Sequence, residues 1–249
     1  MNFDHRVAIV TGSTNGIGET VADKLFSHGA KVIIASKSGL LAKQKAQQLS
    51  PDGHRATGIE CDVSDPEQVR LLVEQTINRY GRLDFAVNNA GKTGDSHTRI
   101  PDQTLENWQS VLATSLSSVF YCMKYELPAM QKSGGGAIVN LSAVNGLVAI
   151  AGLAPYTVAK HGVIGLTKTA ALEYAEQHIR VNAVAPGYVA TPRVNQLPPD
   201  VLHTFAQTHP MSRLATREEV ADLILFLLSD KASFCTGGVY TVDGGYLSR

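Results

Sequence analysis

The sequence contains few cysteines and no excess of either charge. Its 249 residues include 3 Cys, and 22 Lys and Arg balance 22 Asp and Glu, so the formal net charge at pH 7 is zero. A neutral chain has no broad basic surface for nucleic acid or an anionic membrane, so we expect neither as a partner. The cysteines lie far apart without Cys-x-x-Cys spacing, which favours buried thiols in a reducing compartment over disulfides.

Metal-binding patterns and long apolar runs are also missing. The 8 His residues form no His-Glu-x-x-His pattern and no cluster with Cys, so we expect no metal. The least polar stretch, from Ala137 to Ala154, is interrupted by Asn140 and Asn145 and is a poor membrane span. The first residues show no basic region leading into an apolar leader, so a cytoplasmic protein is the simplest expectation.

The chain instead alternates short apolar runs with helical patterns. The runs are rich in Val, Ile and Ala, as is typical of strands covered on both faces. We expect strands at Val7–Thr11, Lys31–Ala35, Thr57–Asp62, Leu83–Asn88, Ala137–Ser142, Arg180–Ala185 and Val239–Val242. We expect helices at Ile17–His28, Pro66–Arg79, Leu105–Gln131, Tyr156–Gln177 and Arg217–Leu228, with Ser64 and Thr216 as helix-start residues. The order predicts one α/β domain over residues 1–249 with a mainly parallel sheet.

The segment from Tyr188 to Arg213 lacks clear periodicity and contains four prolines. A stretch this long inside a compact domain is more often a functional lid than a filler. Its many apolar residues predict a lid over a moderately apolar small molecule. The same side chains would also serve as core or subunit contacts.

A glycine-rich turn, Thr11 to Gly18, follows the first strand and opens the first helix. Glycine tolerates positive φ and lets the backbone approach a pyrophosphate, while the helix start offers free N–H groups to an anion. In this strand–turn–helix context the pattern Gly-x-x-x-Gly-x-Gly predicts a dinucleotide phosphate site.

Taken in order along the chain, the motifs resemble those of the short-chain dehydrogenase/reductase family. They are the Thr-Gly-x-x-x-Gly-x-Gly turn, Asp62, Asn88-Asn89-Ala90-Gly91, Tyr156-Thr-Val-Ala-Lys160, Pro186-Gly187, Thr236-Gly237-Gly238 and Asp243-Gly244-Gly245. The resemblance implies a Rossmann-type, doubly wound, seven-stranded sheet with helices on both faces. It implies a homotetramer or homodimer in which the long helices pair across two-fold axes.

The resemblance also implies an oxidoreductase that interconverts an alcohol and a carbonyl compound by hydride transfer with a nicotinamide cofactor. The residues implied for cofactor binding are Gly12, Ser13, Thr14, Asn15, Gly16, Ile17, Gly18, Ser36, Lys37, Asp62, Val63, Asn89, Ala90, Gly91, Tyr156, Lys160, Pro186, Gly187, Val189 and Thr191.

The end of the second strand bears on the choice between NADP(H) and NAD(H). An acid at this position favours NAD by binding the ribose hydroxyl and repelling a 2′-phosphate. This chain has Ser36 there, followed by Lys37 and Ser38, so we expect NADP(H), with NAD(H) as the alternative. Lys37 also fits an ordinary solvated loop lysine, and Asn15 lacks the basic character common in NADP-preferring relatives.

Tyr156 and Lys160 form the expected reaction centre. They lie four residues apart at the start of a helical pattern and so face the same side. An ammonium group next to a phenol lowers its pKa, so we expect Tyr156 to be the general acid/base with Lys160 assisting.

Two positions depart from the family pattern. The Ser expected thirteen residues before Tyr156 is replaced by Ala143, which has no hydroxyl to offer the substrate oxygen. Ser142 is a weak substitute, because neighbouring side chains on a strand point to opposite faces. Ser115 stands where the family usually has Asn, a tolerable change because the family role uses the main-chain carbonyl.

Three interpretations of Ala143 stay open. In the first, a natural variant uses another donor, with Asn145 and Tyr188 as candidates beside Ala143 for contact with the substrate. In the second, the Ala was introduced to make an inactive form that traps substrate. In the third, the protein binds cofactor without efficient catalysis. The alternative function is therefore a catalytically weak or inactive cofactor-binding regulatory or sensor protein.

Overall fold

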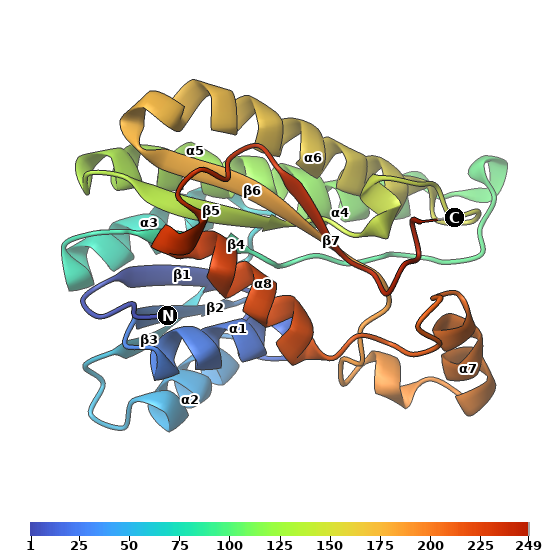
Figure 1. Ribbon diagram of the computed structural model, residues 1–249, viewed down its shortest axis with the longest axis horizontal. Coiled ribbons are helices and arrows are strands. Elements are labelled where there is room, and N and C mark those ends of the chain that lie inside the picture. Colours follow the sequence, from blue (N-terminus) through green and yellow to red (C-terminus); the bar gives the residue numbers. More distant parts are fainter. Residues whose placement is uncertain (249) are drawn as a thin grey trace.

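The computed structural model describes residues 1–248 and builds them around a seven-stranded parallel sheet (Figure 1). The strands are β1 (Val7–Thr11), β2 (Lys31–Ser36), β3 (Ala56–Glu60), β4 (Phe85–Asn88), β5 (Gly136–Leu141), β6 (Ile179–Pro186) and β7 (Val239–Val242). Their order is β3-β2-β1-β4-β5-β6-β7, and each neighbouring pair is parallel. The predicted Rossmann-type sheet is confirmed.

Helices lie against both faces of this sheet. The α-helices of residues 1–248 are α1 (Gly16–Ser27), α2 (Gly39–Leu49), α3 (Pro66–Tyr80), α4 (Leu105–Leu112), α5 (Ser118–Lys132), α6 (Ala154–Tyr174), α7 (Pro199–Gln207) and α8 (Arg217–Leu228). Figure 1 shows α1, α2 and α8 on one face and α4, α5 and α6 on the other, with α7 projecting beyond the sheet. No described helix is long and apolar enough to cross a membrane.

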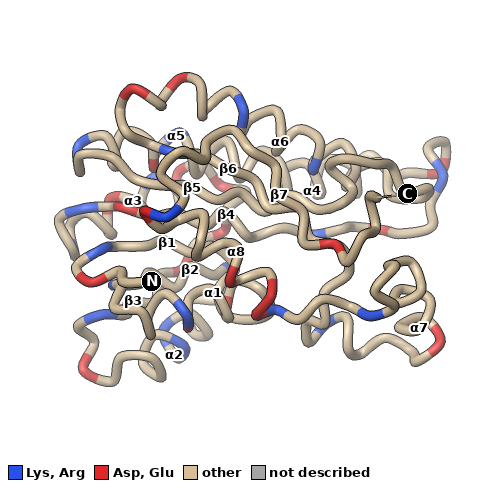
Figure 2. Tube along the Cα trace, viewed as in Figure 1, with Lys and Arg blue, Asp and Glu red and all other residues tan. Residues whose placement is uncertain are grey.

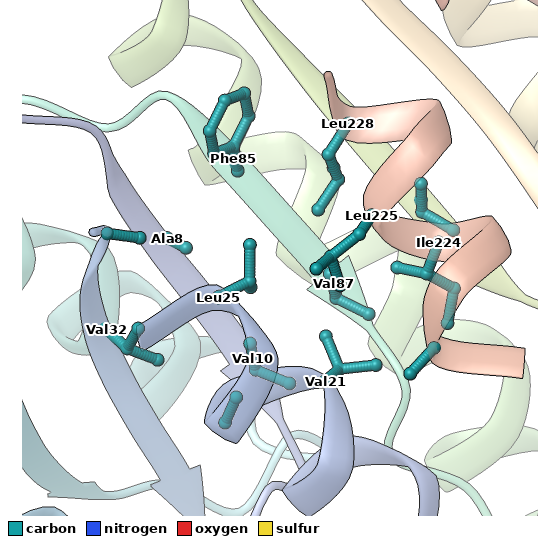
Figure 3. Close-up of a cluster of buried hydrophobic side chains, with 14 of the residues drawn as sticks. Ala8, Val10, Val21, Leu25, Val32, Phe85, Val87, Ile224, Leu225 and Leu228 are labelled. Carbon is teal, nitrogen blue, oxygen red and sulfur yellow. The ribbon is translucent and has the colours of Figure 1, made fainter. Parts of the chain in front are cut away.

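Two hydrophobic clusters fill the spaces between sheet and helices. On the α1/α8 face, Leu25 and Leu225 interdigitate with Val10 and Val87, all of them fully buried (Figure 3). The second cluster packs α3, α5 and α6 against the opposite face. Burial of this kind stabilises by roughly 1.5–3 kcal/mol per large aliphatic side chain. The two clusters thus pack the sheet against the helices on both of its faces.

Helix starts follow local capping chemistry. Thr216 and Glu219 form a complete capping box at the start that the sequence predicts for α8. The expectation for Ser64 is wrong, because the side chain of Asp65 caps α3 and the Ser64 hydroxyl donates to Asp62 instead. Figure 2 shows basic and acidic residues interspersed along the chain, in keeping with the balanced charge.

Several segments differ from the predicted pattern. The expected helix over Leu105–Gln131 is divided by a π-helical turn at Ala113–Ser117. The expected strand end at Ser142 is one residue too long, since β5 ends at Leu141. Helices α2 and α7 were not expected, and α7 lies inside the lid segment Tyr188–Arg213.

Candidate active site

The candidate site lies at the carboxyl ends of β1 and β4. Strand order reverses between these neighbours, and ligands of doubly wound sheets bind at such a switch point. The Thr11 hydroxyl accepts the N–H groups of Asn89 and Ala90 at 3.0 and 3.1 Å. The Asn89 amide donates back to the carbonyls of Thr11 and Gly12 at 2.9 and 3.2 Å. The two loops after β1 and β4 therefore form one unit.

The turn before α1 has the features of an anion site. Gly12 and Gly16 have φ of +63° and +61°, a conformation that side chains rarely adopt. Asn15, the N-cap, makes no side-chain capping hydrogen bond, whereas α2, α3, α4 and α8 are capped by theirs. The first-turn N–H groups of α1 are thus left to another acceptor, which fits a dinucleotide pyrophosphate. Ser13 is buried, and its hydroxyl accepts a hydrogen bond from the Ala35 N–H. The hydroxyls of Thr14 and Ser36 are hydrogen-bonded to each other.

Gly18 supplies the first prediction. An added Cβ there would collide with the Asn89 amide and the Gly12 carbonyl. We expect Gly18→Ala to cost about 1–3 kcal/mol in stability, as overpacking does, and to weaken NADPH binding about tenfold or more because the phosphate turn must shift. Thermal unfolding and fluorescence titration measure both.

The matched control is Gly165→Ala on α6, where an added Cβ meets nothing within 4 Å. It should leave NADPH affinity unchanged, because Gly165 lies on α6 and outside the glycine turn. Equal NADPH affinities for Gly18→Ala and wild type would disprove the phosphate-turn assignment.

Ser36, Lys37 and Asp62 gather beside this turn. Lys37 Nζ lies 2.7 Å from an Asp62 carboxylate oxygen, and the Lys37 side chain is 82% exposed, so this ion pair lies at the surface. The hydrogen bond from Lys37, followed by that from the Ser64 hydroxyl, lowers the pKa of Asp62 to about 2. Ser36 Oγ lies 3.3 Å from Thr14 Oγ1. Hydroxyls and an ammonium therefore lie at the end of β2 where an acid would select NAD.

The predicted reaction centre lies on α6. Lys160 is buried, with Nζ 5.6 Å from the Tyr156 ring centroid, and donates to the Leu141 carbonyl at 2.5 Å. Ser115 Oγ and Lys160 Nζ lie 3.4 and 3.6 Å from where a Gly91 Cβ would stand, so the α6 pair meets the loop after β4. Lys160 thus lies beside both the Tyr156 ring and Gly91, while the catalytic and cofactor-binding roles of these residues stay predictions.

The expected lowering of the Tyr156 pKa is wrong for this structure. Desolvation raises the Tyr156 pKa to about 12 and lowers the Lys160 pKa to about 8. The ammonium interacts directly with the Leu141 carbonyl, and the burial effect on the phenol dominates. The phenol of Tyr156 consequently keeps its proton at neutral pH.

The segment after β5 contains the position at which the family pattern expects a serine hydroxyl to contact the substrate oxygen. The Ser142 hydroxyl donates to the Lys160 carbonyl at 3.0 Å, so it fastens α6 and is not directed at a substrate. Ala143 is extended, with φ of −166°, and therefore directs its methyl group to the side opposite Ser142. Asn145 is buried, and its Nδ2 has no hydrogen-bond partner among residues 1–248. It is an uncommitted amide donor close to this position in the chain.

Ser115 occupies the π-helical turn between α4 and α5. Its hydroxyl accepts from the Lys92 N–H at 2.9 Å and donates to the Lys92 carbonyl at 2.8 Å. A π-turn re-aims the backbone of a helix and is frequent at functional sites. The side chain is thus committed to holding the loop after Gly91, while a role in catalysis stays a prediction.

The predicted lid segment, Tyr188–Arg213, is attached through a histidine that sequence reasoning missed. Buried His209 accepts the Tyr188 N–H on Nε2 at 3.1 Å, and its Nδ1 lies 2.9 Å from the Phe205 carbonyl. Tyr188 stacks on Phe205 with ring centroids 4.0 Å apart, so this candidate substrate residue is part of the lid anchor. A histidine in an aperiodic segment gave no signal of this role.

The remaining predicted cofactor residues line the same edge. Pro186 ends β6, Gly187 N–H donates to the Val242 carbonyl at 3.0 Å, and Val189 bridges to Ala215. Thr191 lies 3.6 Å from where a Gly16 Cβ would stand, so the predicted lid segment begins beside the glycine turn. Ile17 is half-buried on the first turn of α1, and buried Val63 follows Asp62.

This sheet, with a glycine turn at its switch point and a Tyr–Lys pair facing it, defines a dinucleotide-binding oxidoreductase. A family model described as "Enoyl-(Acyl carrier protein) reductase" matches residues 12–247. The chain belongs to the short-chain dehydrogenase/reductase family.

Individual relatives cover almost the whole chain. It is 40% identical over 247 residues to cyclohexanol dehydrogenase of Acinetobacter sp. (strain SE19), covering 99% of this chain and 97% of that protein. It is 43% identical over 244 residues to cis-4-hydroxycyclohexanecarboxylate dehydrogenase of Sinomonas cyclohexanicum, covering 98% and 97%. The solved structure described as "ElxO with NADP Bound" superposes with a TM-score of 0.92 at 35% identity, covering 98% of this chain and 99% of that one.

Proposed function

We propose that this protein is an NADP(H)-dependent oxidoreductase that interconverts a secondary alcohol and its ketone, or an aldehyde and its alcohol. The observation that carries the proposal is the buried Lys160 and neutral Tyr156 on α6, opposite Gly91 at the switch point. A sheet that only bound a nucleotide would have less need for this pair.

The chain's own residues handle the proton, and the bound nicotinamide supplies or accepts the hydride. Tyr156 gives the substrate oxygen its proton, and the Lys160 ammonium places positive charge beside the phenol ring as that proton leaves. A phenol that stays neutral at pH 7 suits carbonyl reduction better than alcohol oxidation, where it must accept the proton.

The substrate we propose is a small, moderately apolar molecule. The lid contains the stacked Tyr188 and Phe205, and Leu147 and Val148, which follow Asn145, are exposed. Two relatives act, by their names, on cyclohexanol and on a hydroxycyclohexanecarboxylate. A panel of cyclic and open-chain ketones, followed by NADPH absorbance, tests the proposal, and the cyclic ketones are expected to react fastest.

The NADP(H) preference gives a prediction at Ser36. Ser36→Asp places a carboxylate beside Thr14 and Lys37, where it repels a 2′-phosphate and accepts the ribose hydroxyls of NAD. We expect NADPH affinity to fall about tenfold and NADH affinity to rise about tenfold, each corresponding to about 1.4 kcal/mol. Titration with both nucleotides measures the change.

Ser27→Asp, at the exposed far end of α1, is the matched control and should leave the preference unchanged. Lys37→Ala should weaken NADPH but not NADH, because only the phosphate needs the ammonium. If wild type binds NADH more tightly than NADPH, the preference is the reverse of the one proposed.

Ala143 favours a second candidate function, a cofactor-binding regulatory or sensor protein with weak or no catalysis. The extended Ala143 offers no hydroxyl, and the neighbouring Ser142 hydroxyl is committed to α6. Tight NADPH binding without turnover of any carbonyl compound, in wild type and in Ala143→Ser, would favour this function over the enzyme.

We also propose that the chain forms a homotetramer or homodimer. Several large apolar side chains are exposed on the helices of one face, namely Trp108 on α4, Phe120 on α5, and Val158 and Leu172 on α6. Leu172 is 85% exposed, and a second copy of the chain would bury this apolar side chain. Sedimentation of the purified chain distinguishes monomer, dimer and tetramer.

A further inference from the structure

A network of buried, hydrogen-bonded polar side chains lies directly beneath the site and spans four elements. Asn88 Nδ2 at the end of β4 donates to Glu126 Oε2 on α5 and to Asn140 Oδ1 on β5, both at 3.0 Å. Asn140 Nδ2 donates to Thr167 Oγ1 on α6 at 3.0 Å, and Thr167 donates to the Val163 carbonyl at 2.8 Å. The four side chains of Asn88, Glu126, Asn140 and Thr167 are 2% exposed or less. The network therefore connects α5, β4, β5 and α6 within the buried interior.

The two members of the network that lie on strands, Asn88 and Asn140, immediately precede site residues. Asn88 and Asn140 are partners in the β4–β5 register. Asn88 precedes Asn89, which closes on Gly12, and Asn140 precedes Leu141, whose carbonyl accepts Lys160 Nζ. A shift of this pair would displace both the phosphate-turn loop and the anchor of the catalytic lysine.

The donors and acceptors indicate the state of Glu126. Both N–H groups of the Asn88 amide are used, yet its Oδ1 is buried without a partner among residues 1–248. A neutral carboxylic acid complements an amide, because its C=O accepts the amide N–H and its O–H donates to the amide C=O. A carboxylate accepts only, which leaves Asn88 Oδ1 unsatisfied at a cost.

No positive charge compensates a carboxylate at this position. Among the described residues, the titratable groups that interact with Glu126 are the buried thiols Cys61 and Cys122, and no ion pair includes it. Burial raises the pKa of Glu126 to about 7, partly offset by the Asn88 hydrogen bond.

We propose that Glu126, as a neutral carboxylic acid, is a positioning residue that sets the placement of Asn89 and Lys160 through Asn88, Asn140 and Thr167. The effect on catalysis rests on the proposed function, whereas the protonation state does not. Deprotonation as pH rises places an unpaired charge under the site and shifts the end of β4.

The first test measures the protonation state of Glu126 in the absence of substrate. The neutral acid contributes stability that is fully present below the ordinary pKa of Glu and is lost as pH rises through about 7. The Tm of wild type should therefore fall relative to Glu126→Gln between about pH 5 and pH 8. In infrared spectra near pH 6, wild type should show the C=O band of a buried carboxylic acid that Glu126→Gln lacks.

The second test measures positioning. Glu126→Leu should lower kcat about tenfold or more with a smaller effect on KM, since the reacting groups are misplaced. Glu126→Gln keeps a neutral hydrogen-bonding group and should restore kcat, and its kcat should decline less than that of wild type above pH 7. Glu173→Gln, an exposed carboxylate on α6, is the matched control.

The outcomes separate the two proposals. No carboxylic acid band and equal pH dependence of Tm in wild type and Glu126→Gln would overturn the inference, whatever the activity. If the band and the Tm shift are present but Glu126→Leu turns over as fast as wild type, Glu126 is a neutral structural acid and the positioning role is overturned. A protein inactive on every substrate that shows both signals refutes the proposed enzyme and leaves the assignment of the proton intact.

Discussion

Replacing Tyr156 with Phe is expected to reduce kcat for carbonyl reduction roughly 10²–10⁴-fold, the usual contribution of a general acid. The substitution removes the phenolic O–H and keeps the ring, whose centroid lies 5.6 Å from Lys160 Nζ. Because the Tyr156 pKa is raised to about 12, the phenol carries its proton throughout the neutral range, as the proposed donor must. NADPH binding should change little, so the loss falls on kcat. Steady-state kinetics and NADPH titration measure both.

The matched control is Tyr174→Phe on the same helix. Tyr174 is half-buried, as Tyr156 is, but it is the last residue of α6 and stands at the end of the helix opposite Tyr156. Tyr174→Phe should therefore retain wild-type kcat. Wild-type turnover by Tyr156→Phe would show that another group donates the proton.

The β/α alternation was readable because buried parallel strands leave continuous apolar runs. Helix α2 could not be predicted from the sequence, because its buried residues, Gly39, Ala42 and Ala46, are small and form no stripe of large apolar side chains. The structure supplies the reason: an added Cβ at Gly58 on β3 would collide with the Ala42 backbone, so α2 packs too closely for larger residues. Leu40 and Leu41 point outward instead, 69% and 50% exposed.

The site was predictable where it depends on local order in the chain. The glycine turn and the Tyr156–Lys160 spacing are local. The turn follows β1, and Lys160 Nζ donates to the Leu141 carbonyl at the end of β5. The Tyr156 pKa depends on burial by distant segments, which no spacing reveals. Glu126 resembles an ordinary surface acid in the sequence, yet it stands four residues from both Cys122 and Met130, on the apolar stripe of α5. That position was the one signal of its burial.

Restoring a hydroxyl with Ala143→Ser is expected to raise kcat for carbonyl reduction about tenfold or more, since one donor at a developing oxyanion is worth roughly 10²–10³ in a comparable acyl-transfer site. Ala143 is extended and points opposite Ser142, whose hydroxyl is fixed on the Lys160 carbonyl. The introduced hydroxyl would therefore point away from the side on which the Ser142 hydroxyl is held. Single-turnover and steady-state kinetics on the best ketone measure the gain.

Ala129→Ser on α5 is the matched control, because Ala129 and Ala143 are both 9% exposed and only the latter adjoins the site. It should not raise kcat. An unchanged kcat in Ala143→Ser would mean that the missing hydroxyl does not limit turnover, and Asn145→Ala then becomes the decisive variant, because Asn145 Nδ2 is a buried donor without a partner among residues 1–248. A large loss in Asn145→Ala would identify the amide as the substitute donor, since a serine hydroxyl and an asparagine N–H can each stabilise charge developing on the substrate oxygen.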